Sequence, residues 1–179
     1  MSTEKQLIER VRAFDQQTLA EVYDQFNPML YRYAIRLLGD VDRAEECVAE
    51  TFSRFLHALQ RGRGPKEHLQ AYLFRISQNW ITDYFRSQPT LPLFQDHDYE
   101  SDTQTDPRSV VVDVHMKEQV RRALLQLTPD QRQVVILKFI EGWSNADVAK
   151  TMRKSIGAVK SLQHRGLETL NHLLAFMRE

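Results

Sequence analysis

The chain has 179 residues, and its 24 basic and 24 acidic side chains give a formal net charge of zero. Its content of 42% hydrophobic and 27% charged residues is typical of a globular protein and excludes a disordered or fibrous one. The single cysteine, Cys47, excludes an internal disulfide and a cysteine-rich zinc site. No apolar run approaches the roughly 20 residues that span a bilayer, and the first residues lack a secretory-signal pattern. We therefore expect a cytoplasmic protein without membrane insertion.

Zero net charge argues by itself against binding to nucleic acid, because nucleic-acid-binding proteins usually carry a basic excess. The charge is uneven along the chain, however. The balance is −2 over residues 1–26, +2 over 27–88, −5 over 89–116 and +5 over 117–179. Neutrality is therefore a cancellation between segments, and the sign of each segment is more informative than the total.

The first segment predicts amphipathic helices. Apolar residues recur at helical spacing over 19–37, and Gly39 is placed to end that helix. A second helix is predicted over 42–59, with the glycine-rich stretch 62–65 ending it. A third, over 69–86, has an apolar side and a polar side. The polar side carries Arg75, Asn79, Thr82, Asp83 and Arg86.

Residues 89–116 differ from both flanking segments. They contain three prolines and an acidic run, and no helical or strand period is visible before about Val110. A structureless loop of this length inside one compact domain would be unusual. The sequence therefore predicts an all-α fold of two small helical domains, 1–88 and 117–179, joined by a flexible acidic linker.

The last segment predicts a helix-turn-helix. Thr128 is placed to cap one helix, with Pro129 at its first position, and Gly142 ends it. Ser144 begins a short second helix, which breaks at Arg153-Lys154. A longer helix capped by Ser155 follows. Ile140 of the first helix and Leu167 of the longer helix are among the apolar residues expected to face the core of this segment. A short helix, a turn and a longer helix are typical of helix-turn-helix proteins.

The start of the last helix is rich in polar and basic side chains. In a helix-turn-helix these residues meet base edges and phosphates in the major groove of DNA. Cations on a helix most often form only a solvated face, but the serine cap, the small residues nearby and the local +5 excess favour DNA binding. The candidate residues are Lys154, Ser155, Lys160, Ser161, Gln163, His164 and Arg165.

Four stretches together resemble one family. Residues 42–52 resemble the core-polymerase-binding helix of extracytoplasmic-function (ECF) sigma factors, of the sigma-70 family of bacterial initiation factors, and 71–86 resemble its promoter −10 helix. Residues 127–132 resemble the start of the fourth conserved region, and 157–165 its −35 recognition helix. The chain departs from many members at the turn, where Arg153 and Lys154 replace a glycine and an apolar residue.

The resemblance implies a function in transcription initiation, with no catalysis and no cofactor or metal. The implied partners are core RNA polymerase, through the clamp coiled coil of its largest subunit and its flap region, promoter DNA, and an anti-sigma factor. The residues that it places on the polymerase are Asp42, Glu46, Glu50 and Arg54. Those that it places on the −10 element are Arg61, Arg63, Arg75, Asn79, Asp83 and Arg86. The −35 set is the group of residues at the start of the last helix.

Three alternatives stay open from the residues alone. The acidic face of helix 42–59 is also compatible with a solvated surface that contains an i,i+4 pair between Glu50 and Arg54. The acidic linker could mimic a nucleic acid in the polymerase channel or act as a plain tether. A stand-alone helix-turn-helix regulator is the alternative function, and it would bind duplex DNA tightly without polymerase.

Overall fold

The computed structural model describes residues 3–88 and 107–176, and every element within these ranges is helical, which confirms the all-α prediction. Most of the predicted linker, residues 89–106, lies outside the described residues. The elements are α1 (Thr3–Arg12), α2 (Gln16–Leu38), α3 (Val41–Gln60), α4 (Leu69–Ser87), α5 (Pro107–Gln126), α6 (Pro129–Val135), the π-helix η1 (Ile136–Ile140), α7 (Asn145–Met152) and α8 (Ile156–Phe176).

Helices α1–α4 form the first helical unit, in which α2, α3 and α4 pack around buried aromatic rings. Tyr33 of α2 and Phe74 of α4 are fully buried and meet edge to face, with ring centroids 5.3 Å apart. Gly39 ends α2 in the left-handed conformation (φ 65°), and its N–H donates to the carbonyl of Ile35 at 2.9 Å. The predicted helices of this segment are thereby confirmed, and α1 is an addition to them.

Helices α5–α8 form the second helical unit, and the predicted start signals work as local capping rules require. Thr128 and Gln131 form a reciprocal capping box at the start of α6. The hydroxyl of Ser144 accepts from the N–H of Asp147, and that of Ser155 accepts from the N–H of Ala158, both at 3.1 Å. Side chains within the unit therefore cap the starts of the helices that form the helix-turn-helix.

Three details differ from the sequence-based expectation. Helix α5 begins at Pro107, inside the segment taken as a linker. Ile140 is 39% exposed, because the π-turn of η1 adds a residue per turn and rotates it away from the core. Leu167 is 42% exposed, because the face of α8 that packs on the unit runs through Val159, Leu162 and Gly166.

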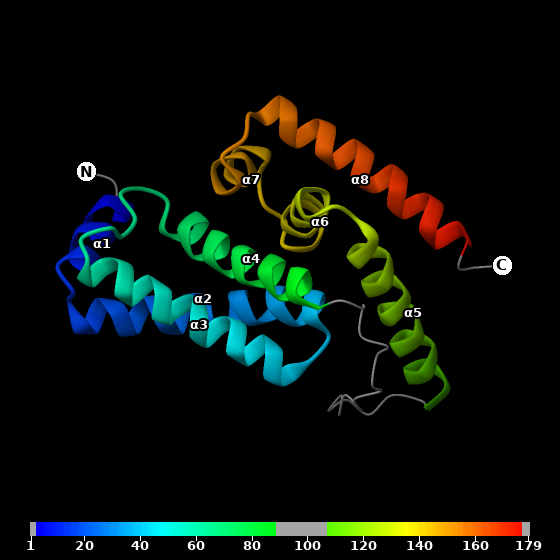
Figure 1. Cartoon of the computed structure of the whole chain (residues 1–179), viewed down its shortest axis with the longest axis horizontal. Coiled ribbons are helices and arrows are strands. Elements are labelled where there is room, and N and C mark those ends of the chain that lie inside the picture. The colour runs from blue at the N-terminus through cyan, green and yellow to red at the C-terminus, as the bar shows by residue number, and fades with distance from the viewer. Residues whose placement is uncertain (1–2, 89–106, 177–179) are drawn as a thin grey trace.

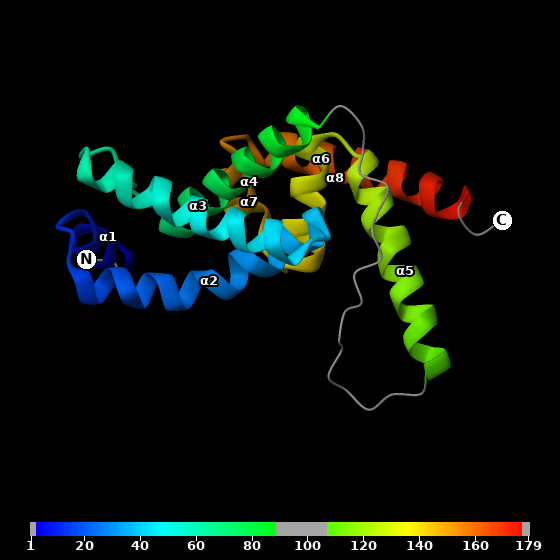
Figure 2. The ribbon, with the colours of Figure 1, turned by 60° about the horizontal axis from the view of Figure 1, so that its bottom comes forward.

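The two units pack directly against each other, with α7 in contact with α4 (Figures 1 and 2). The ring of Trp143, just before α7, meets Phe74 edge to face with centroids 4.8 Å apart. Arg36 of α2 forms an ion pair with Glu141, which follows η1. Buried residues of both units consequently belong to one continuous apolar cluster.

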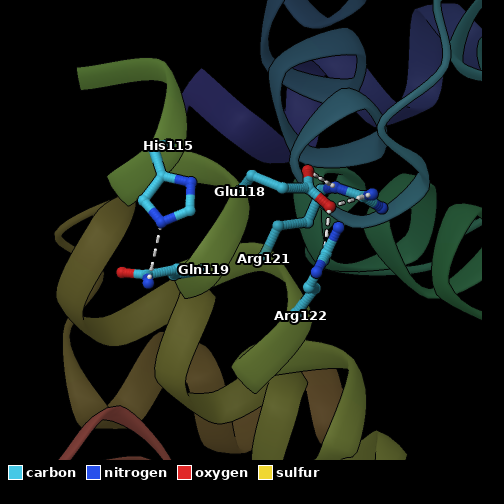
Figure 3. A network of polar contacts seen from close by, with 5 residues as sticks. All are labelled: His115, Glu118, Gln119, Arg121 and Arg122. Atoms are coloured by element: carbon cyan, nitrogen blue, oxygen red, sulfur yellow. Dashed lines mark hydrogen bonds and ion pairs between the residues drawn. The ribbon is translucent and has the colours of Figure 1, made fainter. Parts of the chain in front are cut away.

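Helix α5 makes a second bridge between the units. Glu118 accepts from Arg121 and Arg122 at 3.0 Å each, and Figure 3 shows Arg121 reaching away from α5 toward the first unit. One turn earlier, His115 and Gln119 share a hydrogen bond of 3.1 Å (Figure 3). A side chain at Gly39 would place its Cβ 2.5 Å from the Arg121 guanidinium carbon. Glycine at 39 is therefore favoured by its positive φ, and a larger residue there would also displace the end of the Arg121 side chain.

Candidate nucleic-acid interface

The turn between α7 and α8 is left-handed at Arg153, with φ 53° and ψ 43°. The N–H of Arg153 donates to the carbonyl of Lys150 at 3.3 Å, and that of Lys154 donates to the carbonyl of Ala149 at 3.0 Å. These bonds satisfy the last carbonyls of α7, as in helix ends closed by glycine. The turn thus keeps ordinary helix-turn-helix geometry with an arginine at a position that glycine adopts more easily.

The N-terminal half of α8 exposes one polar face. Four of the predicted −35 residues lie on it, spaced so that they share one side of the helix. Val159 and Leu162 on the opposite side are buried. Within the described ranges, the side chain of Arg165 donates one long hydrogen bond, of 3.4 Å, to the carbonyl of Ser161. The four exposed residues are Lys160, Ser161, His164 and Arg165.

The remaining predicted −35 residues have structural tasks inside the unit. The amide of Gln163 donates to the side-chain oxygen of Asn145 at 2.7 Å and so ties α8 to the start of α7. Lys154 forms an ion pair of 3.0 Å with Asp130 of α6. Ser155 is the N-cap of α8. In this arrangement these three side chains orient the helix, while the four on the exposed face are available to DNA.

The polar side of α4 faces the second unit. Arg75 donates to two backbone carbonyls at the end of α7, to Thr151 at 3.1 Å and to Lys150 at 3.4 Å. Asn79 and Arg86 line a cleft between α4 and the helix-turn-helix, and Arg86 is paired with exposed Asp83 at 3.5 Å. Arg61 and Arg63, also in the predicted −10 set, are exposed in the loop that follows α3.

The predicted polymerase-binding residues lie on the outer side of α3. Asp42, Glu46 and Arg54 are exposed, and Glu50 is partly exposed. Glu46 pairs with Arg43 at 2.6 Å, and Glu50 pairs with Arg54 at 2.8 Å, the i,i+4 pair considered from the sequence. Exposed pairs of this kind contribute roughly 0–1 kcal/mol, so they do not lock the face against a partner.

Sequence reasoning missed the residues that join the two units. Arg132 is buried and donates to the carbonyls of Leu124 and Leu125 at 2.9 Å and of Leu127 at 3.1 Å. Its guanidinium also lies 5.5 Å from the centroid of the Phe85 ring in α4. Burial lowers the pKa of Arg132, because charge is disfavoured away from water. The hydrogen bonds of Arg132 are local, but its contact with Phe85 of α4 joins residues 47 positions apart, and no local pattern reports it.

The aromatic residues at the end of α4 are packing residues. Trp80 is half-buried against the core, and its ring stacks on Tyr84 with centroids 5.6 Å apart and planes 6° apart. Phe85 meets Tyr84 edge to face at 5.4 Å. These rings therefore hold α4 in place and leave its polar side to other contacts.

Both helical units match a known family. Residues 22–89 match the family described as Sigma-70 region 2, and residues 117–170 match Sigma-70, region 4. The chain is 30% identical over 170 residues to the ECF RNA polymerase sigma factor SigX of Bacillus subtilis, covering 92% of this chain and 87% of that relative. This chain belongs to the ECF RNA polymerase sigma factors. It therefore directs promoter recognition by RNA polymerase and is not an enzyme.

A second relative agrees with this membership, and two solved structures share the fold. The sigma factor is 30% identical over 174 residues to BldN of Streptomyces coelicolor, and it spans 65% of the length of that relative. Its fold is similar to that of CnrH in a complex with the cytosolic domain of CnrY, with a TM-score of 0.71, 22% identity and coverage of 97% and 98% of the two chains. It is also similar to RpoE bound to the anti-sigma factor NepR from Bartonella quintana, with a TM-score of 0.63, 24% identity and coverage of 87% and 96%.

Within residues 3–88 and 107–176 of the sigma factor, no helix is long and apolar enough to cross a membrane. The same residues contain no group of three or more histidine, cysteine or acidic side chains arranged to hold a metal ion.

Proposed function

We propose that region 4 of this sigma factor reads the promoter −35 element with the exposed face of α8. The observation that carries the proposal is that Lys160, Ser161, His164 and Arg165 share one solvent-facing side of the second helix of a helix-turn-helix. Residues at the start of this helix enter the major groove in proteins of this architecture. Arg165 has the donor fork that reads guanine, whereas Lys160 suits a phosphate.

Region 2 has the task of holding the opened −10 element. Single strands are bound by cationic and polar side chains together with a loop or an aromatic platform. The polar side of α4 with Arg75, Asn79, Asp83 and Arg86 supplies such groups, and the exposed loop with Arg61 and Arg63 lies next to the start of that helix in the chain. Trp80 and Tyr84 stack on each other, so they support α4 and leave the contact with bases to its polar residues.

The outer side of α3 is the surface for core polymerase. Asp42, Glu46, Glu50 and Arg54 form a mixed-charge face, which suits a coiled coil with charged flanks. Such a partner is the clamp coiled coil of the largest polymerase subunit, and region 4 binds the flap region. Because this partner acts on chromosomal DNA, we expect the sigma factor in the cytoplasm.

An anti-sigma factor is the expected negative regulator. RpoE of Bartonella quintana has a similar fold and was solved with the anti-sigma factor NepR. A protein that covers α3 or α4 of this chain would compete directly with polymerase or promoter DNA. Purification of the chain from its own cells, followed by identification of the bound proteins, tests this expectation.

Transcription with purified components tests the proposed function as a whole. The chain added to core polymerase should start transcripts at discrete sites on a genomic template set, and core polymerase alone should not. The double variant Asp42→Asn/Glu46→Gln should lower both core binding and transcription, while the control Glu21→Gln/Asp24→Asn on α2 should not. Equal binding to core polymerase by the two double variants would show that this face of α3 is not the polymerase-binding surface.

A further inference from the structure

A cleft of about 480 Å³ lies between α4 of region 2 and helices α6 and α7 of region 4. Its volume is within the range of about 300–1,000 Å³ that is typical of small-molecule sites. Residues from both regions line it, so the cleft exists only while the two regions are packed together. Its charged lining residues are Arg75, Arg86, Asp130, Arg153 and Lys154.

The charges in this cleft are not balanced. Lys154 is paired with Asp130 at 3.0 Å, and Arg86 contacts Asp83 at 3.5 Å. Among the residues that the structure describes, no carboxylate lies within ion-pair distance of Arg75 or Arg153. Burial, and then repulsion from the neighbouring charge of Arg153, lower the pKa of Arg75. An anion between them would relieve this repulsion.

The arrangement of Arg75 makes it a fixed anchor. Its Nε and Nη2 atoms donate to the carbonyls of Thr151 and Lys150, which hold the guanidinium at the edge of the cleft. Arg153 also lines the cleft and is exposed, on a turn held by its own backbone hydrogen bonds, two residues after the Thr151 carbonyl that Arg75 contacts. Two arginine side chains from different elements that converge on one space are a common arrangement for phosphate groups, because each can donate two parallel hydrogen bonds.

Neutral polar groups complete the lining. Asn79 and Thr82 of α4 face the cleft. Gln133 and Thr151 also line it and are each 1% exposed, and their side-chain polar atoms have no hydrogen-bond partner within the described part of the chain. Buried polar groups are nearly always paired with protein, water or a ligand. The floor of the cleft therefore has hydrogen-bonding capacity that the packed chain does not use.

We propose that this cleft binds a phosphate-bearing small anion, held between Arg75 of region 2 and Arg153 of region 4. A ligand that requires both regions binds the packed form alone and stabilises it by mass action. On the proposed function, such a ligand also keeps promoter DNA from Arg75, Asn79 and Arg86. The binding itself does not depend on that function, whereas the competition with DNA does.

Titration calorimetry of the full chain with pyrophosphate tests the binding. Sodium chloride of equal ionic strength controls for general screening. The informative variant is Arg153→Gly, because glycine adopts the φ of 53° without strain and the variant should fold at least as well as the parent. We expect saturable binding to the parent and at least tenfold weaker binding to Arg153→Gly. Lys160→Ala, which removes an exposed cation of α8 outside the cleft, should bind as the parent does.

Three outcomes would overturn the anion site. One is the absence of saturable pyrophosphate binding, and a second is equal binding by the parent and Arg153→Gly. A third is Arg153-dependent binding of a short single-stranded oligonucleotide without any binding of pyrophosphate, since the phosphate would then be that of DNA. If pyrophosphate binds in an Arg153-dependent manner but leaves promoter binding by the holoenzyme unchanged, the anion site stands and the competition with promoter DNA fails.

Discussion

At the scale of single residues, Arg132 shows how a charged side chain becomes part of a core. Its guanidinium satisfies three carbonyls at the end of α5, a region where helix carbonyls lack partners of their own. The planar fork presents its donors in a fixed geometry that matches these carbonyls, whereas a lysine ammonium is a compact charge on a flexible stem. Arg132 thereby fixes the corner between α5 and α6.

Replacing Arg132 should therefore be costly. Arg132→Ala should lower the free energy of unfolding by about 3 kcal/mol, because the hydrogen bonds are charge-assisted and the carbonyls stay buried without partners. Arg132→Lys should recover less than half of that loss. Urea unfolding followed by circular dichroism gives both values. A loss below about 1 kcal/mol for Arg132→Ala would mean that water replaces the guanidinium without cost.

Cys47 gives a pH-dependent prediction at the same scale. Burial raises the pKa of its thiol from 9.0 to about 11, and its Sγ lies 3.3 Å from the hydroxyl of Ser77. Since the folded state then holds the proton more tightly than the unfolded state, this contribution to stability is full below about pH 9 and falls as the pH rises toward 11.

The Cys47→Ala variant isolates this effect. Between pH 8 and pH 10 the parent should lose roughly 1 kcal/mol more stability than the variant, as measured by urea unfolding. The native thiol should also resist alkylation at neutral pH and react once the chain is unfolded. Parallel pH profiles for parent and variant, or fast alkylation of the native chain, would contradict the burial of this group.

At the scale of the elements, close packing of α8 on α6 depends on Gly166. A Cβ added there would lie 3.0 Å from Cγ2 of Val135, whereas one added at Gly157 in the same helix would meet nothing nearer than 3.9 Å. Gly166→Val should therefore destabilise region 4 by about 2 kcal/mol through overpacking. Gly157→Ala should be neutral or stabilising by about 0.5 kcal/mol, since alanine favours a helix. Thermal unfolding of the two variants checks this, and equal melting temperatures would contradict it.

The elements also show which features the sequence could predict. The caps at Thr128, Ser144 and Ser155 and the helix end at Gly39 depend on residues within four positions, so local patterns were enough to predict them. The π-turn at 136–140 was not predicted, because no residue pattern in the sequence distinguishes it from an α-helix.

The candidate site likewise has features that local sequence patterns predict and features that they do not. The exposed face of α8 follows from helical periodicity. Four of the seven residues predicted for the −35 element lie on that face, whereas Lys154, Ser155 and Gln163 make contacts within the unit. The contact of Arg75 with the end of α7, and the position of Trp143 against Phe74, join residues about 70 positions apart. Such pairs are determined by tertiary packing, and no spacing rule within either unit reports them.

At the scale of the whole molecule, the two predicted DNA surfaces are brought together. Arg75 and Asn79 of the −10 set and Lys154 of the −35 set line one cleft. Promoter elements about 25 base pairs apart are separated by about 85 Å of duplex at 3.4 Å per pair. On the proposed function one chain contacts both elements, so we expect the two regions to separate when it binds a promoter.

Energy transfer between two dyes measures this separation. In a Cys47→Ala background, cysteines at exposed positions Gln25 of α2 and Asn171 of α8 carry the dyes. Transfer should be high in the isolated chain and fall when core polymerase and promoter DNA are added. Pyrophosphate should oppose the fall if it holds the packed form. Unchanged transfer in the complete initiation complex would show that promoter binding does not require the regions to part.

The central claim is that α8 and α4 read different promoter elements, and transcription from a randomised promoter library tests it most directly. Holoenzymes containing the parent, Arg165→Ala or Asn79→Ala would each select from one library, and the transcripts would be sequenced. Arg165→Ala should relax base preference only around −35, by about 1–3 kcal/mol at the contacted position, and Asn79→Ala should relax it only around −10. Parental preferences in both variants, or the two effects exchanged, would contradict the account.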